Sequence, residues 1–239
     1  WMGYVVGGAL ATPLVAASQR RCGRGRSFQL GLLVALLSAA SCAVAAYLQQ
    51  FALLCLSTTV AGYYSANGQL YRFAAGDLVA PSQRERAISL VLAGGLLGAV
   101  LGPTLASSTK NFLPVPFLGA YLALMGVAAA GMFCMSRVHF PVPLDTLSAA
   151  GTQPSRTALQ LLSQPGFAVA ALCAASSYGV MNLLMAATPI AMDVCGYEFA
   201  DAAFVLQWHV VGMFAPGFIT GHLIKRFGVL TIMGVGVAI

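Results

Sequence analysis

Apolar runs of about 20 residues follow one another along almost the whole chain, separated by short polar stretches. An α-helix of that length crosses the hydrocarbon of a bilayer and satisfies its own backbone hydrogen bonds there. Composition agrees, since 59% of the residues are hydrophobic and 8% are charged, against roughly a quarter charged in a soluble domain. The sequence therefore predicts an all-α polytopic transmembrane bundle, with spans at residues 1–18, 28–47, 52–76, 87–106, 117–136, 166–191, 202–224 and 229–239.

The densest charge cluster is Arg20, Arg21, Arg24 and Arg26, between the first two spans, in a chain with 12 Lys and Arg. Such a cluster cannot lie in hydrocarbon, and the positive-inside bias predicts that it is cytoplasmic. Alternation of the spans then places the other basic loops inside as well, except for Lys110. The net charge of +6 is thus explained by topology rather than by a nucleic-acid partner. We expect a monomeric, multi-pass protein of the cytoplasmic (inner) membrane.

A second basic segment, Gly221 to Gly228, again closes an apolar run with Lys225, Arg226 and a glycine. One span-and-loop unit is thus used twice, which is typical of transporters. We therefore predict a first half bundle at 1–136, a cytoplasmic linker at 137–165 and the start of a second half bundle at 166–239. Because the chain opens and stops within hydrophobic runs, we expect it to be an internal part of a longer protein.

The span at 87–106 contains Gly94, Gly98 and Gly102, followed by Pro103. Glycines four residues apart lie on one helix face and let a neighbouring backbone approach closely, and the proline loosens the next turn. This face is predicted to pack against another helix. A face that slides or bends between two conformations is the functional alternative.

The paired basic motifs, the glycine series and the long polar linker together resemble the major facilitator superfamily. The resemblance implies two six-helix halves that alternate around a central site, with this chain covering most of helix 2 to the start of helix 9. The family's loop signature corresponds to Arg21, Gly23 and Arg24, and in the later copy to Gly221, Arg226 and Gly228. Both copies have a base, Arg20 or Lys225, at the acidic position of the signature. The resemblance implies a conformational role for these residues, as for the glycine face.

Two helices carry polar side chains on one face, whereas 28–47 and 117–136 have no strongly polar interior residue. The resemblance implies that the latter two face lipid and that the spans at 52–76 and 166–191, the family's helices 4 and 7, line the cavity. The polar stripes contain Tyr64, Asn67 and Tyr71 on helix 4, and Tyr178 and Asn182 on helix 7, at helical spacing. A phenol or amide facing acyl chains would be costly, so these stripes should face protein or a wet cavity. Substrate contact and inter-helix hydrogen bonding are the two interpretations.

Three ionisable residues within or beside spans matter most for function. Arg72 can attract an anionic substrate group or extend to the interface. Asp77, one turn later, is expected to pair with a basic loop residue. His209 can pass protons or serve as a hydrogen-bonded structural residue. The stretch Gln207-Trp-His209 resembles a bacterial branch of unassigned substrate, and Gln207 joins Arg72 and His209 as a candidate substrate-binding residue.

An enzyme is not expected, because neither Asp77 nor His209 is accompanied by a second catalytic group. The six cysteines include no C-x-x-C pair, and no metal or other cofactor is expected. The predicted function is secondary active transport of a small molecule by alternating access, coupled to an ion such as the proton. The alternative is a non-transporting receptor or scaffold built on the same fold.

Overall fold

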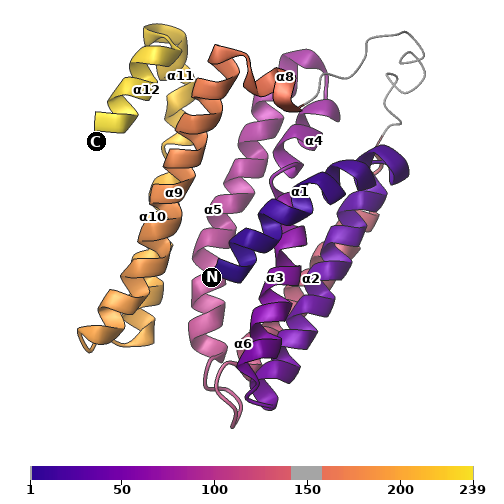
Figure 1. Cartoon of the computed structure of the whole chain (residues 1–239), viewed down its shortest axis with the longest axis vertical. Helices are drawn as coiled ribbons and strands as arrows, with labels where there is room; N and C mark the ends of the chain where they lie inside the picture. The colour runs from indigo at the N-terminus through magenta and orange to yellow at the C-terminus, as the bar shows by residue number, and fades with distance from the viewer. Residues whose placement is uncertain (1, 141–157, 239) are drawn as a thin grey trace. The chain divides into compact units, whose positions relative to one another are not determined.

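The computed structural model describes residues 2–140 and 158–238, and these residues form helices and connecting turns without a strand (Figure 1). The all-α fold class is therefore confirmed for the described chain. Two compact units are present, residues 1–140 with 203–239 and residues 141–202. The helices are α1 (Met2–Cys22), α2 (Arg24–Tyr47), α3 (Phe51–Gly68), α4 (Tyr71–Asp77), the short 3-10 helix η1 (Pro81–Gln83), α5 (Arg84–Thr109), α6 (Leu118–Ser136), α8 (Ala158–Leu162), α9 (Pro165–Val194), α10 (Phe199–Phe214), α11 (Gly217–Phe227) and α12 (Val229–Ala238).

The first unit is organised around α2 and α3. Helix α3 packs against both α1 and α2, and α2 packs against α6 on its other side. Ser27, Phe28 and Asn67 are completely buried at the α2–α3 contact. Ser38, further along α2, is also buried and donates a hydrogen bond to the Ser57 carbonyl at 2.6 Å. One side of α2 therefore packs against neighbouring helices and carries buried polar groups, and the implied lipid-facing position of residues 28–47 stays a prediction for its exposed side.

Helices α1 and α3 cross with their backbones in close contact. A Cβ added at Gly7 would lie 2.7 Å from the carbonyl carbon of Thr59, and one added at Gly62 would lie 2.7 Å from the Tyr4 oxygen. Only glycine can occupy positions where backbone atoms approach so closely. These two glycines make a tight helix contact in this unit, whereas Gly94, Gly98 and Gly102 of α5 have no described neighbour within 4 Å.

Two predicted spans are each divided into two helices. The span at 52–76 is interrupted at Gln69 and Leu70, where the Leu70 amide bonds to Asn67 instead of to the residue four positions back. The span at 202–224 is interrupted at Ala215 and Pro216. Proline has no backbone N–H and its ring clashes with the preceding turn, so the second interruption has a local cause.

Five helical segments among the described residues are long and apolar enough to cross a membrane, namely 24–47, 86–109, 118–136, 165–194 and 199–220. Helices α1 and α3, which cover most of the segments predicted at 1–18 and 52–76, are 21 and 18 residues long but less apolar than these five. Short α8 lies inside the predicted linker, of which 141–157 falls outside the described residues. The predicted division into half bundles and linker stays a prediction.

Candidate functional site

Both copies of the repeated basic motif contain a glycine with the same unusual backbone. Gly23, between α1 and α2, has φ 78° and ψ 165°, and Gly228, between α11 and α12, has φ 83° and ψ 158°. Each amide donates to the carbonyl four residues back, Gln19 at 3.1 Å and Ile224 at 2.9 Å. This combination of φ and ψ is accessible essentially only to glycine. The sequence repeat thus corresponds to two sharp helix-to-helix corners of the same geometry; we call residues 20–26 the elbow.

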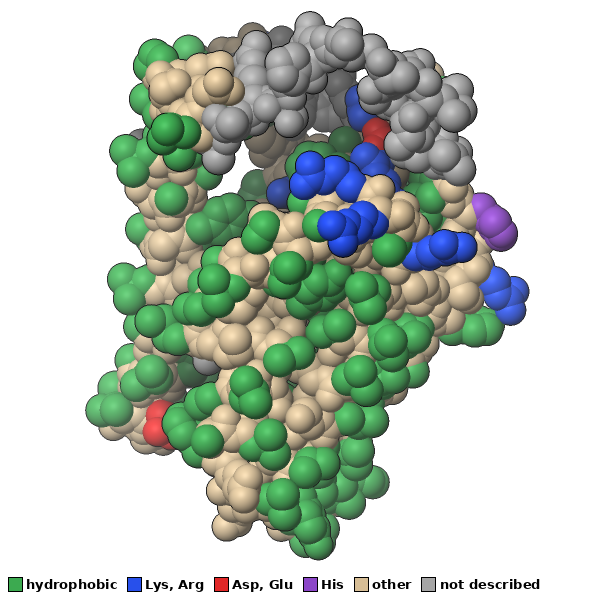
Figure 2. Space-filling model, turned by 45° about the vertical axis from the view of Figure 1, so that its right-hand side comes forward, with side chains coloured by type: hydrophobic (Ala, Val, Ile, Leu, Met, Phe, Trp, Pro, Cys, Tyr) green, Lys and Arg blue, Asp and Glu red, His purple; other side chains and the backbone are tan. Residues whose placement is uncertain are grey.

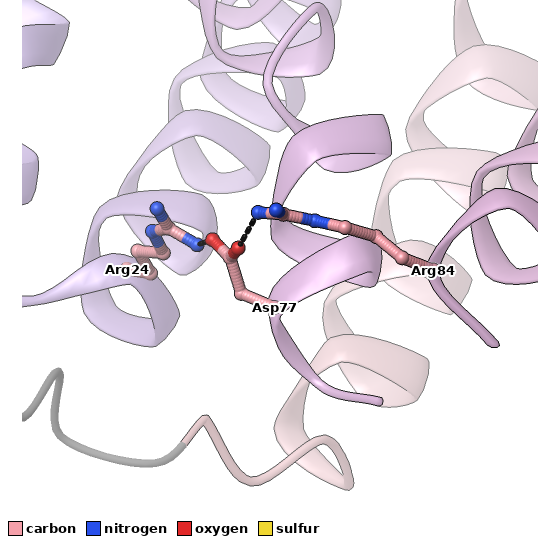
Figure 3. A network of polar contacts seen from close by, with 3 residues as sticks. All are labelled: Arg24, Asp77 and Arg84. Carbon is pink, nitrogen blue, oxygen red and sulfur yellow. Dashed lines mark hydrogen bonds and ion pairs between the residues drawn. The ribbon is translucent and has the colours of Figure 1, made fainter. Parts of the chain in front are cut away.

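An ion-pair cluster joins the elbow to α4 and α5. Asp77, the last residue of α4, accepts a hydrogen bond from Arg24 of α2 and another from Arg84 of α5 at 2.6 Å (Figure 3). The expected pairing of Asp77 with a basic loop residue is confirmed. The Arg84 side chain lies along Gly76, where an added Cβ would be 3.0 Å from its Cγ. We call Arg24, Asp77 and Arg84 the charge cluster.

The Asp77 carboxylate is held in its charged form by this arrangement. The hydrogen bond from Arg24 is the largest influence on its pKa, and the Arg24 charge together with Arg84 lowers the pKa further. Partial burial opposes these effects, but the net result is a pKa below its ordinary value of 3.8. Since 36% of the side chain is exposed, water screens both pairs and each contributes modestly to stability.

An aromatic layer lies next to the charge cluster. The Phe28 ring meets Tyr71 edge-on at 4.7 Å between centroids, and Phe140 packs against Phe28 at 5.5 Å. Gly25 leaves room for Phe140, because an added Cβ would be 3.2 Å from that ring. Phe140, which follows α6 at the start of the predicted linker, therefore packs against the first turns of α2.

A chain of polar side chains continues from this layer into the bundle. Ser18 of α1 donates to Ser27 of α2 at 3.0 Å, and Ser27 donates to the Asn67 oxygen of α3 at 3.4 Å. Gly31 permits this approach, since an added Cβ would be 2.9 Å from the Asn67 amide nitrogen. Asn67 therefore bonds between helices in this structure, which is the alternative interpretation of its place in the stripe.

The remaining residues of the polar stripe in the span at 52–76 lie on either side of the interruption at Gln69 and Leu70. Tyr64 is on α3 and half-buried, whereas Tyr71 and Arg72 begin α4. The Tyr71 hydroxyl and the Arg72 Nε are buried without a hydrogen-bond partner among the described residues. The Arg72 guanidinium lies 5.0 Å from the Phe73 ring centre. Both roles suggested for Arg72 stay predictions.

The other candidates lie on α9 and α10. Tyr178 is exposed on α9, and the Asn182 side chain donates to its carbonyl at 2.8 Å within the same helix. Gln207 and His209 are half-buried on α10, and the His209 Nε2 has no partner in the described part of the chain. The candidates on α3 and α4 belong to one compact unit and those on α9 to the other. Their convergence on a shared cavity stays a prediction.

The glycine face of α5 has no neighbour among the described residues. An added Cβ at Gly94, Gly98 or Gly102 would meet no described atom within 4 Å, and Pro103 lies within the continuous helix. The predicted packing and conformational roles of this face both stay predictions.

A family comparison matches residues 2–239 to the model of the Major Facilitator Superfamily. The chain belongs to this family. The fold shared by its members agrees with the helical bundle described above, and the family is one of transporters rather than of enzymes. The chain also fits the expected multi-pass membrane protein, since its described residues include several helices able to span a bilayer.

Three curated relatives are transporters by name. The chain is 36% identical to the riboflavin transporter RfnT of Brucella anthropi over 99% of its own length and 59% of that protein. It is 29% and 27% identical to the uncharacterized MFS-type transporters YddS and YdeG of Bacillus subtilis, over 94% of the chain and 55% of each relative. The chain thus spans little more than half the length of these relatives. No solved structure gives a significant match.

Several residues of the site had no distinct signal in the sequence. Ser27, Phe28 and Phe140 resemble ordinary loop or core residues, and Gly62 belongs to no glycine series. Their importance arises from contacts between helices distant in sequence. Gly25 and Gly31 could have been noticed as small residues on either side of Phe28. Only the packing shows that Gly25 makes room for Phe140 and Gly31 for Asn67.

Proposed function

We propose that the full-length protein is a secondary active transporter of the Major Facilitator Superfamily, driven by an ion gradient and working by alternating access. The observation that carries this proposal is family membership over residues 2–239. The repeated glycine corners at Gly23 and Gly228 support it, because equivalent corners in two halves suit a mechanism in which the halves rock against each other.

We further propose a flavin-like substrate, with riboflavin as the first candidate. The support is the identity to a riboflavin transporter over nearly the whole chain, which includes both polar stripes. Tyrosine rings stack on flat ring systems, and their hydroxyls bond to polar edges. Tyr64 and Tyr178, with the amide of Asn182, are the side chains we propose for these contacts. Arg72, Gln207 and His209 are retained as further candidates, and the proton as the coupling ion.

The charge cluster is proposed to stabilise one of the alternating states. It connects α2 to α4 and α5 through exposed ion pairs, each worth on the order of 0.2–1 kcal/mol. States that exchange during transport differ by only a few kcal/mol. Contacts of this size can bias the exchange and still break once in every cycle.

Counterflow tests the proposal whatever the direction of transport and the coupling ion are. The full-length protein is reconstituted into vesicles loaded with unlabelled riboflavin, and labelled riboflavin is added outside. Transient accumulation of label is expected, and protein-free vesicles serve as the control. Riboflavin binding without any counterflow would instead support the receptor alternative. Counterflow of another solute, with none of riboflavin, would retain transport but remove the flavin proposal.

A further inference from the structure

Arg21 and Arg26 are the two elbow arginines without a partner among the side chains that the structure describes. Arg24 contacts Asp77, and the Arg20 Nε donates to a backbone carbonyl of α1 at 3.3 Å. Arg21 and Arg26 are exposed, and neither has a hydrogen-bond or ion-pair partner among the side chains that the structure describes. Two guanidinium groups beside one corner are therefore available to an anion from outside the chain.

The local charge at the elbow is unfavourable without such an anion. The first turn of α2 contains Arg24 and Arg26 and no acidic residue, and Gly23 supplies no side-chain cap. The amino end of a helix favours negative charge, so basic residues there are placed against the helix dipole. Asp77, which pairs with Arg24 at the elbow, is already shared with Arg84. No described carboxylate therefore compensates the positive charge of Arg26.

Arg26 stands at the end of an exposed apolar stripe on α2. Leu30, Leu33 and Leu37 follow it at intervals of four, three and four residues, which place all four side chains on one helix face. Each of the three leucines is exposed. A guanidinium group at the end of a membrane span, directly above such a stripe, lies at the depth of lipid headgroups.

Helix α1 repeats the arrangement in the opposite chain direction. Leu14 and Leu10 precede Arg21 by seven and eleven residues, so they share its helix face, and both are exposed. Figure 2 shows Lys and Arg side chains gathered together on one part of the surface, with hydrophobic side chains covering the surface beyond them. Each helix of the elbow therefore combines one free arginine with an apolar surface below it.

We propose that the elbow is a binding site for an anionic glycerophospholipid. Arg21 and Arg26 hold the phosphodiester, because guanidinium groups match phosphate oxygens in shape and charge. The leucine stripes of α1 and α2 contact the acyl chains. A soluble anion would use the arginines alone, whereas the stripes favour a lipid. Arg21 and Arg26 are not members of the charge cluster, and their proposed role does not depend on the proposed transport function.

The test compares lipid binding by the full-length protein and two variants. Native mass spectrometry is performed with equal amounts of phosphatidylglycerol and phosphatidylcholine. An arginine near an anionic lipid surface contributes about fivefold in affinity, so the double variant Arg21→Gln/Arg26→Gln should bind phosphatidylglycerol about 25-fold more weakly. Arg137→Gln is the matched control. Arg137 is exposed at the end of α6 and stacks on Phe133 at 4.7 Å, and its loss should leave binding unchanged.

Three results would overturn the proposal: no preference of the unmodified protein for phosphatidylglycerol, full binding by the double variant, or an equal loss in Arg137→Gln. The last would mean that total charge rather than the elbow attracts the lipid. If the double variant does not fold, the single variants Arg21→Gln and Arg26→Gln are each expected to lose about fivefold. Unchanged affinity in both would refute the site equally well.

Discussion

The crossing of α1 and α3 predicts a large effect from the smallest possible substitution, Gly62→Ala. The added methyl group would lie 2.7 Å from the Tyr4 carbonyl oxygen and closer still to backbone atoms of Gly7 and Gly8. Ordinary van der Waals contact begins near 3.4 Å. The obstacles are backbone atoms of α1 and cannot rotate away. The two helices therefore have to separate by more than about half an ångström.

The magnitude follows from two opposing contributions. Overpacking a tight contact costs about 1–3 kcal/mol, and a backbone obstacle places this change at the upper end. The substitution also stabilises the helix by about 1 kcal/mol, because alanine is a better helix former than glycine. The net loss is therefore about 2 kcal/mol. For a chain of this size, that loss lowers the melting temperature by about 4–8 °C.

The assay is thermal unfolding of the full-length protein in detergent, followed by the loss of its monodisperse chromatographic peak. Gly98→Ala is the matched control, since it makes the same change within α5, where no described atom lies within 4 Å of the new methyl group. Its melting temperature should stay the same or rise. A Gly62→Ala protein at least as stable as the unmodified protein would refute the reasoning about the crossing.

Three further predictions concern the charge cluster, the topology and the glycine face. Asp77→Asn should lower stability by about 1 kcal/mol near neutral pH. Because the pKa of Asp77 is lowered on folding, this difference should persist above pH 3.8, shrink as the pH falls below that value, and diminish in high salt, as measured by unfolding midpoints. In a cysteine-free background, Arg21→Cys should react with an impermeant reagent only in permeabilised cells and Lys110→Cys in intact cells, and the reverse pattern would overturn the topology. Gly98→Leu should keep its normal melting temperature but lose counterflow, with one-sided accessibility of introduced cysteines, whereas normal flux would remove the conformational role of this face.

Local chemistry made much of the helical organisation predictable from sequence. Long apolar runs indicate helices directly, and Arg20 to Arg26 cannot remain in hydrocarbon, so a corner had to form near Gly23. Pro216 also carried a signal for the end of α10, although the prediction extended the span across it. The interruption at Gln69 and Leu70 had no comparable signal. After the interruption, residues at both ends of α4 contact α2, Tyr71 through Phe28 and Asp77 through Arg24.

The candidate site was less predictable because helical spacing identifies a face but not its neighbour. Asn67 and Tyr71 share a polar stripe, yet Asn67 bonds to Ser27 and Tyr71 packs against Phe28, both on α2. A polar stripe serves equally well for a cavity or for another helix. Asp77 was easier to interpret, since a carboxylate beside several arginines has few alternatives to an ion pair.

The elbow also explains how one short basic segment can perform more than one task. Successive helix positions turn by about 100°, so Arg24 and Arg26, two positions apart in the first turn of α2, point to nearly opposite sides. Arg24 is directed inward to Asp77, and Arg26 therefore has to point outward, above the leucines of α2. Topology alone would require only positive charge on one side of the membrane, wherever the arginines pointed. The position of each arginine along α2 therefore decides whether it joins the internal ion pair or lies above the exposed leucines. The total charge of the segment does not decide this. For this reason, the comparison of Arg21 and Arg26 with Arg137 is more informative than any change in net charge.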